Sequence, residues 1–172
     1  ISKRKDRELI AIQIQKSTKR EIILSTEKDK KLFNEAAEYF QTNLKHYEEN
    51  DWIPHESIRA INRRQNTLWH YGINEWNELF SNRQLLVLVI LLKNIRIVCE
   101  KISDKDYAKT IITYLASMLC KLVDANCYST VYDPATSKIS NALTFRQPGI
   151  SSNHAEINPF IRVRGGLYNI LN

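Results

Sequence analysis

The stretch SNRQLL, residues 81–86, opens the apolar run Leu85–Leu92 and decides the central part of the fold. Ser81 is a typical helix N-cap residue, because its side-chain oxygen can accept a hydrogen bond from a backbone amide two or three residues later. The apolar run supplies the helix interior. Because it is apolar on every side, more than one neighbouring element must cover it. The sequence therefore predicts a buried helix from Ser81 to about Ile102.

Arg83 falls in the first turn of this helix, where the helix dipole disfavours positive charge by about 0.3–1 kcal/mol. Two interpretations of its partner stay open. The first is a local ion pair with Glu75 or Glu78. The second is an anion or a domain contact, such as a DNA phosphate or a neighbouring carboxylate.

The N-terminal part has two different hydrophobic patterns. Residues Leu9–Gln15 and Glu21–Leu24 are rich in β-branched side chains and predict a β-hairpin that turns at Lys16–Lys19. Thr26 is then a suitable cap for a long helix over Glu27–Glu49. Its predicted apolar stripe consists of Leu32, Phe33, Ala36, Ala37, Tyr39, Phe40, Leu44 and Tyr47.

A second helix follows the buried one after a very short turn. Ser103 and Asp104 predict its start, and it should run from Lys105 to about Asn126. Such a tight connection favours an antiparallel helical hairpin. The predicted core face of the second helix is Ala108, Ile111, Ile112, Leu115, Met118, Leu119 and Leu122.

The predicted fold class is α+β and mainly helical, in a single domain over residues 1–172. Residues 1–50 form the β-hairpin and the long helix, and residues 51–80 form a connector. Residues 81–126 form the helical hairpin. Residues 127–172 form an irregular segment, because prolines interrupt it, with short strands predicted at Tyr128–Tyr132 and Ile139–Phe145.

The composition is that of an ordinary globular domain of 172 residues, with 43% hydrophobic and 26% charged residues. The net charge of +6 permits a nucleic-acid partner without requiring one. The apolar run is far shorter than the roughly 20 residues that span a bilayer. No export signal opens the chain, so we expect no membrane contact and a cytoplasmic location.

Cysteine and histidine patterns give little sign of chemistry. Cys99, Cys120 and Cys127 are odd in number and lack Cys-x-x-Cys spacing, which fits a reducing compartment. Cys99 and Cys120 fall on helix faces that we expect to be buried, where packing is the natural role. The four histidines have no metal-ligand spacing, so no metal is expected.

Several short motifs occur in a recognisable order. The block Tyr71-Gly72, Trp76, Leu79-Phe80 and Arg83-Gln84-Leu85-Leu86 resembles the sequence YG…W…LF-x-x-RQLL of the large adenine-specific DNA methylases. The further matches, in chain order, are Arg20–Leu24 with Thr26–Asp29, then Asp124, Asn126 and Cys127, then Phe145-Arg146-Gln147, and finally Ala155-Glu156-Ile157-Asn158-Pro159-Phe160. Nearly the whole chain is covered. In place of the family's Trp-Asp-Phe, however, this chain has Ser152-Asn153-His154, which puts any role of that acidic residue in doubt.

The resemblance implies a class I enzyme that transfers a methyl group from S-adenosylmethionine to the exocyclic amine of adenine in DNA. The family's glycine-rich cofactor loop precedes the matched region, and its Asp-Pro-Pro-Tyr motif follows it. Neither occurs in this chain, and a first residue Ile1 instead of Met fits a fragment. We therefore expect a central portion of a methyltransferase that holds no cofactor and is inactive alone, with DNA and the rest of the enzyme as partners. The alternative is a non-enzymatic helical module that binds nucleic acid or protein, or a structural domain whose charge means little.

Two groups of residues are candidates for DNA contact. The first is Arg59, Arg63 and Arg64, beside Trp69 and Tyr71, since cations suit phosphates and aromatic rings suit bases. A solvated basic loop with buried aromatic rings is the alternative.

The second group is Arg146 and Gln147, residue types that read guanine and adenine, and a structural network is its alternative. Asn158-Pro159-Phe160 resembles a methyltransferase active-site turn but lacks the second proline. We therefore expect no catalytic residue here and a proline-enforced turn that packs Phe160.

Overall fold

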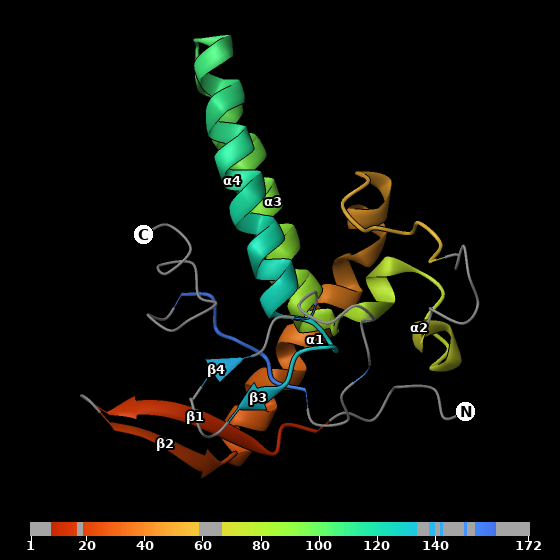
Figure 1. Ribbon diagram of the computed structural model, residues 1–172, viewed down its shortest axis with the longest axis vertical. Helices are drawn as coiled ribbons and strands as arrows, with labels where there is room; N and C mark the ends of the chain where they lie inside the picture. Colours follow the sequence, from red (N-terminus) through yellow and green to blue (C-terminus); the bar gives the residue numbers. More distant parts are fainter. Residues whose placement is uncertain are drawn as a thin grey trace.

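The computed structural model of the chain describes residues 8–16, 19–58, 67–133, 138–139, 142, 150 and 154–160. It is mainly helical, with a β-hairpin near the N-terminus, as Figure 1 shows. Its elements are β1 (Ala11–Lys16), β2 (Lys19–Leu24), α1 (Glu27–Glu49), α2 (Thr67–His70), the 3₁₀ helix η1 (Trp76–Leu79), α3 (Asn82–Glu100), α4 (Lys105–Ala125), β3 (Tyr132–Asp133) and β4 (Lys138–Ile139). The predicted fold class is confirmed.

The β-hairpin has the strands that the sequence predicts. β1 and β2 are antiparallel, and the register pairs Ala11 with Leu24 at the open end and Lys16 with Lys19 beside the turn. The hairpin is tied to α1 by an ion pair of 2.9 Å between Glu8 and Lys30. This contact places the hairpin beside the start of α1.

Helix α1 begins and ends at the predicted residues. The Thr26 hydroxyl accepts a hydrogen bond from the Asp29 amide, and the Asp29 carboxylate accepts one from the Thr26 amide. This reciprocal pair satisfies two amides that have no partner within the helix. Capping of α1 is therefore a sufficient structural role for both Thr26 and Asp29.

Only part of the predicted apolar stripe of α1 is covered. Phe40 and Tyr47 are buried, whereas Leu32 and Tyr39 are more than half exposed. The reason is that α1 packs mainly against one helix, α3, so the outer members of the stripe find no neighbour. The predicted stripe is therefore wider than the face that α3 covers, and Leu32 and Tyr39 lie outside that face.

The predicted connector is more ordered than its sequence suggests. Its described part contains α2 and η1, and Leu68, Ile73 and Leu79 form a small core of their own. Gly72 follows α2 with a φ of +73°, a left-handed conformation that other residues rarely adopt. The chain can therefore reverse after α2 and bury Ile73.

Helices α3 and α4 form the predicted antiparallel hairpin. We call residues 93–114 the tip of the hairpin, and Figure 1 shows the tip extending away from the other elements. The predicted caps are both present: Ser81 starts α3, and the Asp104 carboxylate accepts hydrogen bonds of 3.0 Å from the amides of Asp106 and Tyr107 to start α4. The expected two-sided cover of the apolar run is confirmed as well. One side of α3 packs on the cluster Phe40, Tyr47 and Ile53, and another packs on the cluster Met118, Leu122 and Ile157.

Some predictions for the helical hairpin and the C-terminal part need correction. Cys120 is exposed, as is Ile112, because both lie toward the outer side of α4, whereas Cys99 is buried as expected. The predicted strand Tyr128–Tyr132 begins as a buried turn; Val131 forms a single antiparallel bridge with His154, and the strand pair proper begins at Tyr132, opposite Ile139. Within the described parts of the chain, no helix has the length and apolar character needed to cross a membrane.

Candidate functional site

Some of the residues that carry the methylase resemblance, namely Arg83, Gln84, Asn126 and Glu156, meet at the start of α3. Ser81 and Gln84 cap the helix reciprocally: the Ser81 hydroxyl accepts from the Gln84 amide, and the Gln84 side-chain oxygen accepts from the Ser81 amide at 2.8 Å. The same hydroxyl donates to the Glu156 carboxylate at 2.9 Å. A helix cap is thereby joined to a residue 75 positions further along the chain.

Arg83 also turns to Glu156. Its guanidinium lies 3.6 Å from the carboxylate and 4.3 Å from the centroid of the Phe33 ring. The local pair with Glu75 or Glu78 is not formed, because the Glu75 carboxylate binds His55 at 2.9 Å and the Glu78 carboxylate accepts hydrogen bonds from nearby backbone amides. A carboxylate from a distant segment and an aromatic ring therefore offset the unfavourable position of Arg83 in the helix dipole.

Gln84 and Asn126 form the buried centre of this cluster. Both are almost fully buried, with 1% and 2% of their surface exposed. The Gln84 amide donates to the Asn126 oxygen at 3.3 Å, and the same oxygen accepts from the Ile157 backbone amide at 3.2 Å. Asn126 thus joins the start of α3, the end of α4 and the segment 154–160. We name Ser81, Arg83, Gln84, Asn126 and Glu156 the junction cluster.

Glu156 is the charged member that the other residues stabilise. Burial alone would raise the pKa of this carboxyl, but the nearby His154 imidazole, the Arg83 charge and the Ser81 hydroxyl together outweigh burial and lower the pKa. The His154 ring nitrogen lies 3.7 Å from the carboxylate. The carboxylate is therefore held in its ionised form, in which it accepts hydrogen bonds and donates none.

The segment after α4 closes the cluster from the outside. The rings of Tyr128 and His154 meet edge to face at 4.8 Å, and the Tyr128 amide donates to the Leu79 carbonyl at 2.8 Å. The Thr130 hydroxyl lies 2.9 Å from the Ala155 carbonyl oxygen. These partners are far apart in the sequence, and no pattern in the sequence predicts that they come together.

The Asn158-Pro159-Phe160 turn is present, but it packs differently from the prediction. The Asn158 side-chain oxygen accepts a hydrogen bond of 3.0 Å from the Phe160 amide. Pro159 is buried, whereas Phe160 is 63% exposed. The proline, not the aromatic ring, is the residue that packs inward, because the turn directs the ring away from the cluster.

Several predicted DNA contacts lie outside the described residues. These are Arg59, Arg63, Arg64, Phe145, Arg146 and Gln147. The backbone of Trp69 belongs to α2, and Tyr71 is half exposed beside it. DNA contact by these residues stays a prediction, as does DNA contact by Arg83, whose guanidinium already has a partner.

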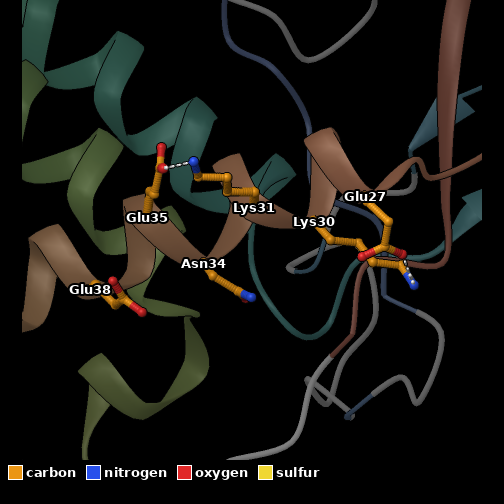
Figure 2. Close-up of a pocket in the computed structure, with 6 residues that line it drawn as sticks. All are labelled: Glu27, Lys30, Lys31, Asn34, Glu35 and Glu38. Atoms are coloured by element: carbon orange, nitrogen blue, oxygen red, sulfur yellow. Dashed lines mark ion pairs between the residues drawn. The ribbon is translucent and has the colours of Figure 1, made fainter.

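The described residues contain no group of three or more histidine, cysteine or acidic side chains that could hold a metal ion. Figure 2 shows a surface depression whose six lining residues all belong to one helix, α1. Its Lys31 and Glu35 pair with each other at 3.7 Å, and Lys30 pairs with Glu27 at 3.4 Å. Such an exposed, internally neutralised face is not an enclosed ligand site.

Comparisons of the chain with protein-family models, curated proteins and solved structures gave no match. The function therefore has to be argued from the junction cluster itself. Within it, each named polar group is engaged by another, and the cluster joins three segments of the chain. Its chemistry is that of a structural joint.

Proposed function

We propose that the chain is the non-catalytic central portion of a DNA adenine amino-methyltransferase. In this role it is a scaffold that also contacts DNA, and it is inactive alone. S-adenosylmethionine would be bound by the parent enzyme outside these residues. The single observation that carries the proposal is the junction cluster, where residues of three separate motifs of the resemblance meet: Gln84 is hydrogen-bonded to Asn126, Asn126 is hydrogen-bonded to Ile157, and Arg83 pairs with Glu156.

This convergence supports the proposal for a physical reason. A chance resemblance gives no reason for residues of separate motifs to lie together, although other motif residues, such as Tyr71, Trp76 and Phe160, are exposed. Here Gln84 and Asn126 are buried, and the Glu156 carboxylate is only 19% exposed. Residues that are buried together in one hydrogen-bonded cluster constrain one another, because removal of one leaves another unsatisfied.

The test uses the complete product of the gene that contains this chain. Expressed in a host without adenine methylation, it should produce N6-methyladenine in the host DNA, measured by mass spectrometry of the nucleosides. The Glu156→Gln variant should lose methylation because it loosens the scaffold, whereas Glu35→Gln on the exposed face of α1 should retain it. Residues 1–172 alone should neither bind S-adenosylmethionine in calorimetry nor methylate DNA.

Two results would overturn the proposal. The first is a complete gene product that carries no glycine-rich loop upstream and no Asp-Pro-Pro-Tyr motif downstream, and produces no methyladenine. The second is micromolar cofactor binding or methyl transfer by residues 1–172 alone. The first result would favour the alternative, a helical module that binds nucleic acid or a protein. That alternative has support in the exposed apolar side chains of the hairpin tip, such as Val98 and Tyr114.

A further inference from the structure

We propose that one flank of the tip of the α3–α4 hairpin binds the phosphate backbone of double-stranded DNA. The flank consists of Lys93 and Arg96 on α3 and Lys105 and Lys109 on α4, and we name it the basic flank. The inference rests on the proposed function for its choice of DNA as the polyanion. It assigns DNA contact to described residues that the sequence motifs do not include.

The helical periodicity places the two cations of α3 on one side. Val89 packs against α1, and Lys93 and Arg96 follow it by four and seven residues, so they continue the same side of α3 toward the tip. Figure 1 shows the tip standing clear of α1. This side of α3 is therefore apolar where α1 covers it and basic beyond the end of that contact.

The two cations of α4 lie on the same flank of the hairpin. Cys99 of α3 and Ala108 of α4 are both buried near the turn and mark the seam between the two helices. Arg96 and Lys93 lie about 60° and 120° around α3 from Cys99, and Lys105 and Lys109 lie about 60° and 100° around α4 from Ala108, in the same rotational sense along each chain. Because the two helices are antiparallel, the same rotational sense leads to the same flank of the hairpin.

In the described parts of the chain, none of the four cations lies within ion-pair distance of a carboxylate, and all four are exposed. Helix α1 is different, because Lys30, Lys31 and Lys45 each pair with a glutamate. Glu100 follows Arg96 by four residues and is an acidic residue on the same side of α3. Neighbouring like charges on one helix face repel each other. An external polyanion would remove this repulsion.

The dimensions suit a short stretch of backbone. Lys93 to the end of α3 at Glu100 covers about 10 Å at a rise of 1.5 Å per residue. This length corresponds to about three phosphates of one strand, which are about 3.4 Å apart along a duplex axis. The helix across the hairpin adds a second row of cations about 8–10 Å away. About four phosphates can thus be contacted at once.

The test is fluorescence anisotropy with a labelled DNA duplex and the 172-residue chain at several salt concentrations. The quadruple variant K93A/R96A/K105A/K109A should bind at least 10-fold more weakly at about 0.1 M salt. Its slope of log K against log salt should be smaller by about 3.6, since each of the four phosphate contacts contributes about 0.9. The matched control K28A/K31A/K45A/K121A removes the same amount of charge from exposed positions elsewhere and should change affinity by less than 3-fold.

Three outcomes would overturn the inference: no binding by wild type at low salt, equal loss in both variants, or equal binding to poly-glutamate at matched charge. The last would assign the flank to an acidic protein. Failure of this inference and failure of the proposed function are distinguishable. If the complete gene product methylates DNA equally well with and without the quadruple change, only the DNA contact of the basic flank is contradicted. If the flank binds DNA but the complete gene product makes no methyladenine, only the methyltransferase function is contradicted.

Discussion

The base and the tip of the α3–α4 hairpin are built from the same two helices but have opposite surroundings. At the base, α1 and the segment 154–160 cover the pair, and even polar side chains such as Gln84 are almost fully buried. At the tip, only the narrow seam between the helices is buried, and apolar side chains such as Val98 and Tyr114 are exposed. Hydrophobic periodicity determines which residues form the contact between α3 and α4. Whether the remaining side chains are buried depends on whether another element packs on them.

The charges follow the same division. At the base, the Arg83 guanidinium meets the Glu156 carboxylate and the Phe33 ring. At the tip, the cations of the basic flank meet solvent. A charge at the base is thus part of the folded structure, while a charge at the tip is available to a partner. The predictions below test this division.

The largest effect is expected from a charge at the base. Leu122 is fully buried, so Leu122→Asp would place an unpaired carboxylate in the core, at a cost comparable to the whole stability of a domain, about 5–15 kcal/mol. We expect no cooperative thermal unfolding transition for this variant, as followed by circular dichroism.

The matched control is Tyr114→Asp on the same helix, where the side chain is 73% exposed. This variant should melt within a few degrees of wild type, because surface substitutions usually change stability by less than about 0.5 kcal/mol. Equal destabilisation of both variants would show that the tip is covered and would remove the contrast.

The second prediction concerns pH. The pKa of Glu156 is lowered in the folded protein, so its stabilising contribution is present above the ordinary glutamate pKa, about 4.3, and is lost as the pH falls through the lowered value. Glu156→Gln should cost about 1–3 kcal/mol at pH 7. Its unfolding free energy should also fall less than that of wild type below about pH 4.3.

Urea unfolding at pH 7, 5 and 3.5 measures both effects. Glu35→Gln, on the exposed face of α1, serves as the control and should follow the wild-type curve. Parallel curves for wild type and Glu156→Gln across this range would mean that the carboxylate is not held by Arg83 and its neighbours.

The regular elements were largely predictable because their signals are local. Thr26, Ser81 and Asp104 each start a helix, as their side chains predict, and the tight reversal before Lys105 favours an antiparallel hairpin. The exposed Ile112 and Cys120 were mispredicted for one reason. Periodicity predicts which residues share a helix face. The width of the part of that face that becomes buried depends on tertiary packing, which periodicity does not contain.

The candidate site was predictable only in part. The family motifs pointed to Arg83, Gln84 and Glu156, but local reasoning alone offered Arg83 a partner in Glu75 or Glu78. The actual partner, Glu156, is distant in the sequence and has no local signature. The burial of Pro159 in place of Phe160 could not be predicted, because a turn motif does not specify which of its side chains faces the core.

The third prediction compares the two helix caps of the hairpin. At the base, the Ser81 hydroxyl both caps α3 and donates to the Glu156 carboxylate, so Ser81→Ala should cost about 2 kcal/mol. At the tip, the Asp104 carboxylate only caps α4, so Asp104→Ala should cost about 1 kcal/mol. Urea unfolding of both variants measures the difference. A larger loss for Asp104→Ala would mean that the tip contributes more to stability than the base.

The smallest effect is a difference in the rates at which the cysteine thiols react with a reagent, measured on the unmodified sequence. Cys120 is exposed and should react at once with a thiol reagent in the native protein, whereas Cys99 and Cys127 should wait for local opening. Burial also raises the pKa of Cys127, which lowers its thiolate fraction further. Cys99 lies near the tip, where two helices alone cover it, so it should react before Cys127 at the base, because regions with fewer buried contacts open more easily. Mass spectrometry after timed labelling assigns the order. If Cys127 reacted first, the junction cluster would be the weaker end of the hairpin, and the contrast between base and tip would be reversed.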